Sequence, residues 1–251
     1  MLGPMIEIDK NGSELSPLEL WIENIKKGQK QFAVLVDPDK CTKEMVPKLM
    51  KYLPQQATHI FVGGSTVAPG KTHQLICAIK QHGALPVWIF PGDAEQISSE
   101  ADALLFLSLI SGNNPKYLIG QQTRAAAQLR TMDLHTISTA YLLIDGGAQS
   151  AEARVTGTQP LPSEDLEMIL NRTMAAYHMG VKAIYLEAGS GAKYPVAPVI
   201  IRRIKTATGL PLIVGGGLRQ EAQIQTAWDA GADMVVVGTA IEEVKIGRAH
   251  V

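Results

Sequence analysis

The sequence predicts an α/β protein whose residues 1–251 form one domain, a (β/α)8 TIM barrel. Eight short runs rich in β-branched residues alternate with longer amphipathic segments, which is the pattern of repeated βα units and a parallel sheet. A parallel barrel commonly reaches about 250 residues as a single domain. Eight units with intervening helices favour this closed barrel over an open, doubly wound sheet.

The expected strands share a feature at their C-terminal ends, where seven of the eight run into Gly, Asp or Ser. These residues suit sharp turns and close approach to a ligand. We therefore expect the functional site at this end of the barrel. The strands are expected at residues 31–39, 58–65, 85–92, 102–111, 138–147, 182–191, 210–217 and 232–239.

Amphipathic segments between the strands are expected to form the outer helices. Two of them end in Gly180 and Gly231, which suit the left-handed conformation just past a helix. An extra helix before the first strand has Ser16 as its expected N-cap and Pro17 in its first turn, and we expect it to cover the barrel floor. The segments between strands include 41–53, 115–130, 163–180 and 219–231.

The final helix is expected to be truncated. After Ala240 only IEEVKIGRAHV remains, whereas a barrel needs a helix of roughly ten residues or more over its closing seam. Residues 246–251 read like a translated sequencing adaptor, so we expect them not to be native. Such an end would lower stability and leave the active-site loops largely intact.

Composition excludes several classes of protein. The net charge of −1 gives no global attraction to nucleic acid or an anionic membrane. The two cysteines, Cys41 and Cys77, form no zinc or disulfide pattern, and the N-terminus shows no signal peptide, so we expect a cytoplasmic protein. The longest apolar run, residues 101–110, is far shorter than the roughly 20 residues of a membrane-spanning helix.

One stretch, FVGGSTVAPGKT at residues 61–72, is close to a nucleotide-binding P-loop. That loop has four residues between its two glycines, a spacing that lets backbone N–H groups wrap a polyphosphate. Here five residues separate Gly64 from Gly70, and Ser65 stands where the first glycine should be. The spacing therefore excludes a P-loop.

Glycines near the C-terminal end of the sequence predict a phosphate site. Gly216 and Gly217 follow the seventh strand, while Gly238 and Thr239 follow the eighth, which is where barrels of this kind commonly bind phosphate. Backbone N–H groups and the start of a helix stabilise an anion without a lysine. The alternative is that these glycines serve only tight turns.

Oxygen ligands after the first two strands predict a site for Mg²⁺. Asp37 ends the first strand and Ser65 ends the second, and carboxylate and hydroxyl oxygens suit a hard divalent cation. An alternative role is to cap the helix expected near Thr42, which suits Asp39 better than Asp37.

The sixth strand ends in YLEAGSG, where Glu187 is a candidate base. Tyr185 lies two residues earlier and is expected on the same side of the strand. The alternative for Glu187 is a salt bridge to Lys182 or Lys193. Asp145, after the fifth strand, is a further candidate, although the sequence DGG is also typical of a turn.

Six motifs in this order resemble the geranylgeranylglyceryl phosphate synthase family, which includes bacterial heptaprenylglyceryl phosphate synthase. They are VDPDK, FVGGST, LIDGG, YLEAGSG, IVGGG and VVVGT, and the resemblance covers roughly residues 17–243. It implies an Mg²⁺-dependent prenyltransferase of ether-lipid biosynthesis. A polyprenyl group, typically geranylgeranyl, passes from its diphosphate to the C3 hydroxyl of sn-glycerol 1-phosphate.

The resemblance also implies roles for particular residues. Asp37 and Ser65 match metal-binding positions, and Glu187, with Tyr185, would orient or deprotonate the attacking hydroxyl. It further implies a homo-oligomer, and any contact with a membrane surface would be transient and made through the lipid product. The positions matching the glycerol 1-phosphate site are Tyr185, Leu186, Glu187, Ala188, Gly189, Ser190, Gly191, Gly216, Gly217, Gly238 and Thr239.

Prenyl chain length stays open. Members similar to the bacterial heptaprenyl enzyme have a lysine two residues before the strand-one aspartate, where this chain has Leu35. The longer chain and the extra N-terminal segment instead resemble the second, larger group of the family. We expect the prenyl groove near strands two to four, around Trp88, Phe90 and Leu107.

Two other functions stay open from the residues alone. A phosphosugar isomerase would share the phosphate site and use an acid–base pair, for which Asp37 and Asp145 are available. A phosphate-ligand sensor would bind glycerol phosphate without forming a product.

Overall fold

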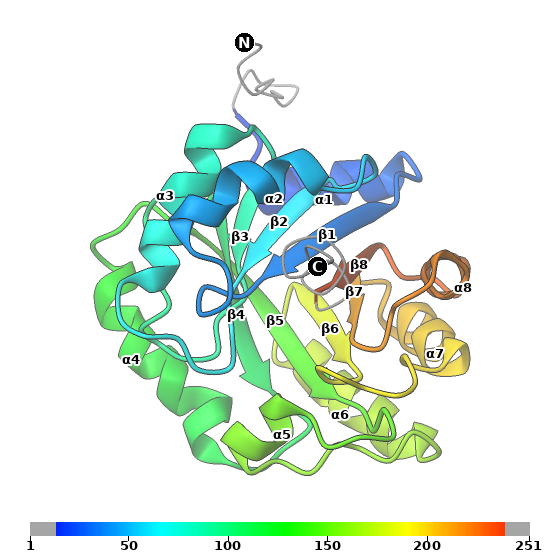
Figure 1. Cartoon of the computed structure of the whole chain (residues 1–251). Coiled ribbons are helices and arrows are strands. Elements are labelled where there is room, and N and C mark those ends of the chain that lie inside the picture. Colours follow the sequence, from blue (N-terminus) through cyan, green and yellow to red (C-terminus); the bar gives the residue numbers. More distant parts are fainter. Residues whose placement is uncertain (1–13, 239–251) are drawn as a thin grey trace.

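The computed structural model describes residues 14–238, which form a closed barrel of eight parallel strands in chain order (Figure 1). Each strand pairs with the next, and β8 pairs with β1 to close the ring. All eight expected strands are confirmed, although their ends differ by several residues. They are β1 (Gln31–Val36), β2 (His59–Val62), β3 (Val87–Ile89), β4 (Ala103–Leu109), β5 (His135–Leu143), β6 (Ala183–Glu187), β7 (Leu212–Gly215) and β8 (Met234–Val237).

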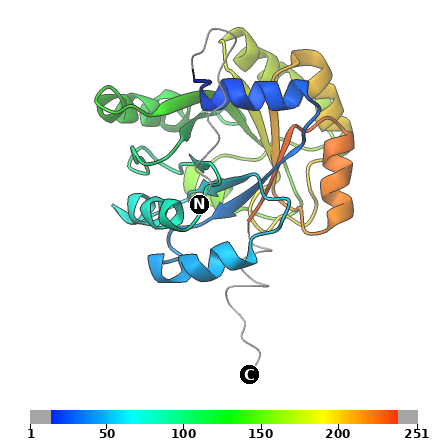
Figure 2. The same ribbon diagram turned by 90° about the horizontal axis from the view of Figure 1, so that it is seen from above.

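Helices surround the barrel (Figures 1 and 2). A 3₁₀ turn, η1 (Lys43–Met45), leads into α2, and one turn of π-helix, η2 (Lys116–Gly120), leads into α4. The expected truncated final helix, including residues 246–251, lies outside the described residues. The helices are α1 (Pro17–Lys26), α2 (Val46–Tyr52), α3 (Lys71–His82), α4 (Gln121–Leu129), α5 (Ala151–Thr156), α6 (Leu166–His178), α7 (Pro198–Thr208) and α8 (Glu221–Asp229).

The expected helix ends are confirmed where the sequence named them. Gly180 (φ 88°) follows α6 and Gly231 (φ 114°) follows α8, both in the left-handed region that favours glycine. Within residues 14–238, no helix is long and apolar enough to cross a bilayer.

Two apolar layers stabilise the barrel, because alternate strand residues point to opposite faces. The outer layer joins strands to helices and contains Val62, Ile89 and Ile204. The inner layer fills the barrel and contains Phe61 and Tyr185.

Helix α1 covers the barrel floor, as expected. The Ser16 hydroxyl accepts a hydrogen bond from the Glu19 N–H, and the Glu19 carboxylate accepts one from the Ser16 N–H, which completes a capping box. Trp21, only 1% exposed, packs edge-on against Trp88 of β3 with ring centroids 5.6 Å apart. The Trp21 side chain thus closes the floor of the barrel.

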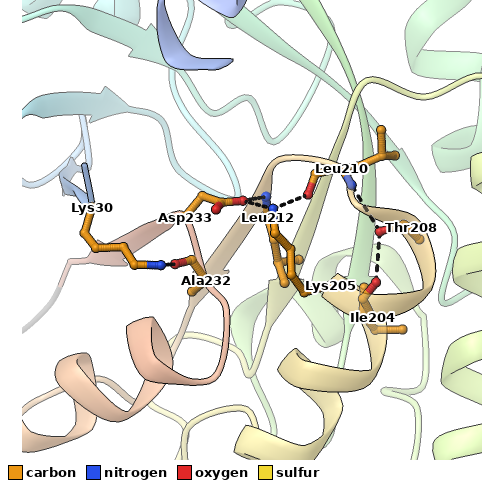
Figure 3. A network of polar contacts seen from close by, with 8 residues as sticks. All are labelled: Lys30, Ile204, Lys205, Thr208, Leu210, Leu212, Ala232 and Asp233. Carbon is orange, nitrogen blue, oxygen red and sulfur yellow. Dashed lines mark hydrogen bonds and ion pairs between the residues drawn. The ribbon is translucent and has the colours of Figure 1, made fainter. Parts of the chain in front are cut away.

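A cluster of polar contacts around Asp233, which we call the floor clasp, joins the last strands at this floor (Figure 3). The Asp233 Oδ2 accepts hydrogen bonds from the Lys205 Nζ at 2.6 Å and from the Leu212 N–H at 2.8 Å. The Lys30 Nζ donates to the Ala232 carbonyl at 2.8 Å, and the backbone N–H of Gln31 donates to the Asp233 carbonyl. These bonds fasten α7, β7, β8 and the start of β1 to one another.

The same clasp occurs a second time, half a turn around the barrel. The Asp102 carboxylate accepts from the Lys80 Nζ at 2.6 Å and from the Val87 N–H at 2.7 Å. In both clasps the lysine lies seven positions before the first residue of its strand, Val87 or Leu212. The units containing β3–β4 and β7–β8 therefore share one local design.

Candidate active site

A cavity of about 450 Å³ opens at the C-terminal ends of the strands. Its polar end lies after β1 and β2, and its apolar part lies along β3, β4 and α4. Helix α5 and the loop after β6 border it on another side. The residues used below that line it are Asp37, Gly64, Ser65, Phe90, Phe106, Leu107, Tyr117, Tyr141, Glu152, Val155, Ser190 and Gly238.

Asp37 lies at the polar end, where its carboxylate is held by neighbouring residues. The Asp37 Oδ1 accepts the Asp39 N–H at 2.9 Å, and the Oδ2 lies 3.6 Å from the Lys40 Nζ. A side chain on Gly64 would approach the Oδ1 to 2.8 Å, so only glycine lets the β2 end lie this close. Asp37 and Ser65 thus share one end of the cavity.

The alternative that Asp39 caps a helix is wrong. Its carboxylate instead pairs with Lys71 at 2.7 Å. The N-cap positions of η1 and α2 are Thr42 and Met45.

Gln96 holds the end of β2 and was missed in the sequence. Its side-chain amide donates to the Gly64 carbonyl at 2.9 Å and accepts the Gly64 N–H at 3.3 Å. Gln96 is itself buried. A lone glutamine in a loop carries no local signal of such a contact across 32 positions, so only the fold shows it.

The apolar part of the cavity contains two of the three residues expected around a prenyl groove, Phe90 and Leu107. Phe90 stacks on Tyr185 with ring centroids 4.9 Å apart and meets Tyr141 edge-on. The expectation for Trp88 is wrong, because it lies in the floor core against Trp21 and is only 1% exposed.

Glu187 and Tyr185 point to the same, inner side of β6, as the two-residue period predicts. A side chain on Gly215 would come within 2.7 Å of the Glu187 Oε2 and would also meet the Tyr185 hydroxyl, so this glycine makes room for both. The Glu187 Oε1 accepts the Gly189 N–H at 2.7 Å. Glu187 is 6% exposed and is not among the residues that line the cavity.

The salt-bridge alternative for Glu187 is wrong, because no cation among residues 14–238 forms an ion pair with it. The Lys193 Nζ lies over the Tyr194 ring, 5.0 Å from its centroid. Burial raises the pKa of Glu187 to about 8, and the nearby Glu152 carboxylate adds to the rise. The Gly189 N–H and the Tyr185 hydroxyl partly oppose this rise.

Two tyrosines surround the same carboxylate. Burial raises the pKa of Tyr141 and Tyr185 well above the usual value, and the Glu187 charge adds to both shifts. The Tyr185 hydroxyl is close enough to influence Glu187, yet it forms no hydrogen bond of normal geometry with any described residue. Both phenols are therefore neutral near pH 7.

Glu152 is a second carboxylate of the site and was not identified in the sequence. It lies on α5 and lines the cavity, and its Oε2 accepts the Ser190 N–H at 3.3 Å. The local sequence signal for this helix is Ser150, a residue type typical of an N-cap.

The glycines after β7 have the conformations that only glycine adopts readily. Gly216 (φ 79°) and Gly217 (φ 69°) pack against the loop after β6, so a side chain at Gly216 would overlap the Glu187 carboxylate. Tight turning therefore explains these glycines. It leaves untested the prediction that they also bind phosphate.

Five other predicted phosphate-site positions divide into three groups. Ser190 and Gly238 line the cavity. The side chains of Leu186 and Ala188 pack into the outer core, so only their backbones face the site. Thr239 lies outside the described residues.

The family is decided by comparison with known proteins. A family model described as the PcrB family matches residues 24–249. The chain belongs to the PcrB family. A geranylgeranylglyceryl phosphate synthase of Flavobacterium johnsoniae is 50% identical over 222 residues, covering 88% of this chain and 91% of that protein. A protein of the same name from Zunongwangia profunda is 47% identical over 225 residues, with 90% and 96% covered.

Solved structures support the same placement in the PcrB family. The crystal structure of (S)-3-O-geranylgeranylglyceryl phosphate synthase from Thermoplasma acidophilum, in complex with its substrate sn-glycerol-1-phosphate, matches with a TM-score of 0.83. It is 33% identical, and the match covers 92% of this chain and 94% of that one.

Metal-binding groups in this PcrB family barrel are sparse. Across residues 14–238, no three or more His, Cys, Asp or Glu side chains gather in a way that could hold a metal ion. A site built from Asp37 and Ser65 would therefore need oxygens from substrate and water, which is how Mg²⁺ is often bound.

Asp145 does not join the site of this PcrB family member. It is exposed, and its Oδ1 accepts the Gly147 N–H at 2.8 Å, which is a turn contact. Asp145 is absent from the cavity wall that includes Asp37. The acid–base pair expected for a phosphosugar isomerase is therefore not brought together.

Proposed function

We propose that the protein transfers a geranylgeranyl or similar polyprenyl group from its diphosphate to the C3 hydroxyl of sn-glycerol 1-phosphate. One observation carries this proposal. A single cavity joins the oxygen ligands Asp37 and Ser65 to an apolar wall that includes Phe90, Phe106 and Leu107. Such a cavity is complementary to a ligand with a charged head and a long apolar tail.

The relatives support this reading. Those from Flavobacterium johnsoniae and Zunongwangia profunda carry the name geranylgeranylglyceryl phosphate synthase, and the Thermoplasma acidophilum structure holds sn-glycerol-1-phosphate. For this chain we assign glycerol 1-phosphate to the loops after β6 and β7 and to Gly238 and Thr239, which follow β8. The residues assigned are Tyr185, Glu187, Gly189, Ser190, Gly191, Gly216, Gly217, Gly238 and Thr239, with the backbones of Leu186 and Ala188.

Mg²⁺ is the cofactor we assign to the polar end of the cavity. The donors there are a carboxylate and a hydroxyl, an oxygen set that suits a hard cation, and Gly64 leaves the Asp37 Oδ1 unobstructed. Asp37 and Ser65 would hold the ion. When bound, it would neutralise the charge that develops on the departing diphosphate.

In the proposed step the C3 hydroxyl oxygen forms an ether bond to C1 of the prenyl chain. The bond from C1 to the diphosphate oxygen breaks, and its electron pair leaves with the diphosphate. The hydroxyl proton passes to the Glu187 carboxylate, for which a pKa of about 8 gives adequate basicity near neutral pH. Tyr185, beside it, orients that carboxylate and the hydroxyl.

The setting of the enzyme is also part of the proposal. Cys41 and Cys77 are not joined in a disulfide, which supports a reducing, cytoplasmic location. We expect a homo-oligomer, and a transient contact with the membrane surface on release of the lipid product.

The direct test is to incubate the purified chain with radiolabelled glycerol 1-phosphate, Mg²⁺ and a series of prenyl diphosphates from geranyl to heptaprenyl. Labelled prenylglycerol in the organic phase after phosphatase treatment would establish the transferase and its chain length. Product should be lost with EDTA and in Asp37→Asn. Binding of glycerol 1-phosphate with no product for any donor would contradict the proposal and favour a sensor.

A further inference from the structure

Helix α5 is a short element held over the cavity from the side of β4. The Tyr117 hydroxyl donates to the Val155 carbonyl at 3.2 Å, and the Asn114 side chain donates to the Thr156 carbonyl at 3.2 Å. Tyr117 and Val155 also line the cavity. Asn114, in the loop after β4, and Tyr117, on η2, thus fix the C-terminal end of α5 beside the apolar wall.

The other end of α5 packs against the loop after β6. The Ser150 hydroxyl caps the helix by accepting the Ala153 N–H at 3.1 Å. A side chain on Gly189 would come within 2.5 Å of the Ser150 Cβ, so glycine permits this close packing. Helix α5 therefore bridges the apolar wall and the loop that follows Glu187.

Two carboxylates meet at this bridge on adjacent backbone groups. The Gly189 N–H donates to Glu187, and the next N–H, that of Ser190, donates to Glu152. Within the described part of the chain neither carboxylate is in an ion pair. Two acidic side chains are therefore held near each other without a cation between them.

We propose that Glu152 is a positioning residue that acts through Glu187. Its negative charge makes Glu187 a stronger acceptor for the hydroxyl proton, and its contact with Ser190 holds the loop after β6 closed over the acceptor substrate. The identity of that substrate rests on the proposed function. The effect of Glu152 on Glu187 is independent of the proposed function, because it follows from the arrangement of the two side chains.

The other groups around Glu187 show how much of its pKa shift Glu152 can account for. Tyr185 on the same strand and Tyr141 on β5 face it and stay neutral, and Gly215 and Gly216 on the β7 side present backbone only. Burial alone raises the pKa of Glu187, so removal of Glu152 lowers it only in part. The nearby charge that can be removed without changing burial is therefore that of Glu152.

The test compares Glu152→Gln and Glu152→Ala with wild type. Glutamine removes the charge but still accepts the Ser190 N–H, whereas alanine removes both. Glu167→Gln is the matched control, because Glu167 is exposed on α6 and its nearest cation, Arg203, is 4.0 Å away. The pKa of Glu187 is read by NMR titration of ¹³C-labelled glutamate carboxyls, with Glu187→Gln used to assign the signal.

In Glu152→Gln the Glu187 pKa should fall by about one unit, as expected for removing a nearby negative charge. The acidic limb of the kcat/KM profile should move by the same amount. Glu152→Ala should add a rise in KM for glycerol 1-phosphate. An unchanged Glu187 titration in Glu152→Gln would overturn the proposal. A wild type that forms no product would instead overturn the proposed function, since the titration is read without turnover.

Discussion

Two buried carboxylates at opposite ends of the barrel have opposite surroundings. Asp233, on the floor, accepts hydrogen bonds from a lysine and a strand N–H (Figure 3). Glu187, at the other end, is equally buried, but it has one backbone N–H donor and a second carboxylate nearby. Glu187 is 6% exposed and Asp233 5%, so burial alone does not separate the two.

This difference indicates which buried carboxylate stabilises the fold and which has a chemical role. A paired carboxylate balances the cost of leaving water with strong local contacts. An unpaired one is destabilising, and it persists where a raised pKa is useful. Asp233 therefore belongs to the scaffold, while Glu187 is the candidate base.

Replacing Glu187 should give the largest effect. Glu187→Gln should lower kcat by about 10²–10⁴, the usual contribution of a general base. The same substitution should raise the free energy of unfolding at high pH. A carboxyl with a raised folded pKa loses its stabilisation as pH rises toward 8, so the variant should unfold at higher urea than wild type at pH 9. Activity assays and urea titrations check both, and a variant of wild-type activity would contradict the assignment.

Breaking the floor clasp should reduce stability and leave the chemistry intact. Asp233→Ala leaves the Lys205 ammonium and the Leu212 N–H without their acceptor, and should cost about 3 kcal/mol of unfolding free energy. Asp102→Ala removes the more exposed copy and should cost about half as much. Urea unfolding measures both. Equal costs would show that burial does not set the strength of the clasp.

A buried histidine of the floor should make stability depend on pH. Burial lowers the pKa of His59 to about 4, below the roughly 6.5 of an unfolded histidine. The unfolded chain then binds the extra proton first, so stability should fall as pH drops from about 6.5 to 4, by up to about 3 kcal/mol. His59→Gln should have a shallower decline over this window in urea unfolding. Parallel curves would refute the role of His59.

The smallest effect is expected at the cap of the floor helix. Ser16→Ala removes the side chain that accepts the Glu19 N–H, and should cost about 1 kcal/mol. Thermal unfolding should show the loss, while kcat should not change. Ser16→Asp, which retains an acceptor, is the matched control and should restore most of the stability.

Local patterns in the sequence were enough for the strands and for several site positions. Alternating units gave all eight strands, and Ser16, Gly180 and Gly231 marked helix ends correctly. The placement of Asp37 and Ser65 at one end of a cavity follows from parallel strands ending at one face. These features depend on neighbours in the chain, which is why the sequence carries them.

Contacts across long separations could not be read in the same way. Gln96 bonds to Gly64, and Asp233 to Lys205, across 32 and 28 positions. Trp88 was assigned to the prenyl groove because an inward apolar residue looks the same at either end of a barrel. Glu152 was missed because its role depends on where α5 packs, and nothing local to the residue states that.

The floor bonds between the first and last strands imply an order of events during folding. The Lys30 side chain and the Ala232 carbonyl that it binds are 202 positions apart. Bringing such distant segments together carries the largest loop-closure entropy in the ring, whereas neighbouring strands meet across short connections. The seam between β1 and β8 therefore forms late, and its amide hydrogens should be the last in the barrel to gain protection from exchange.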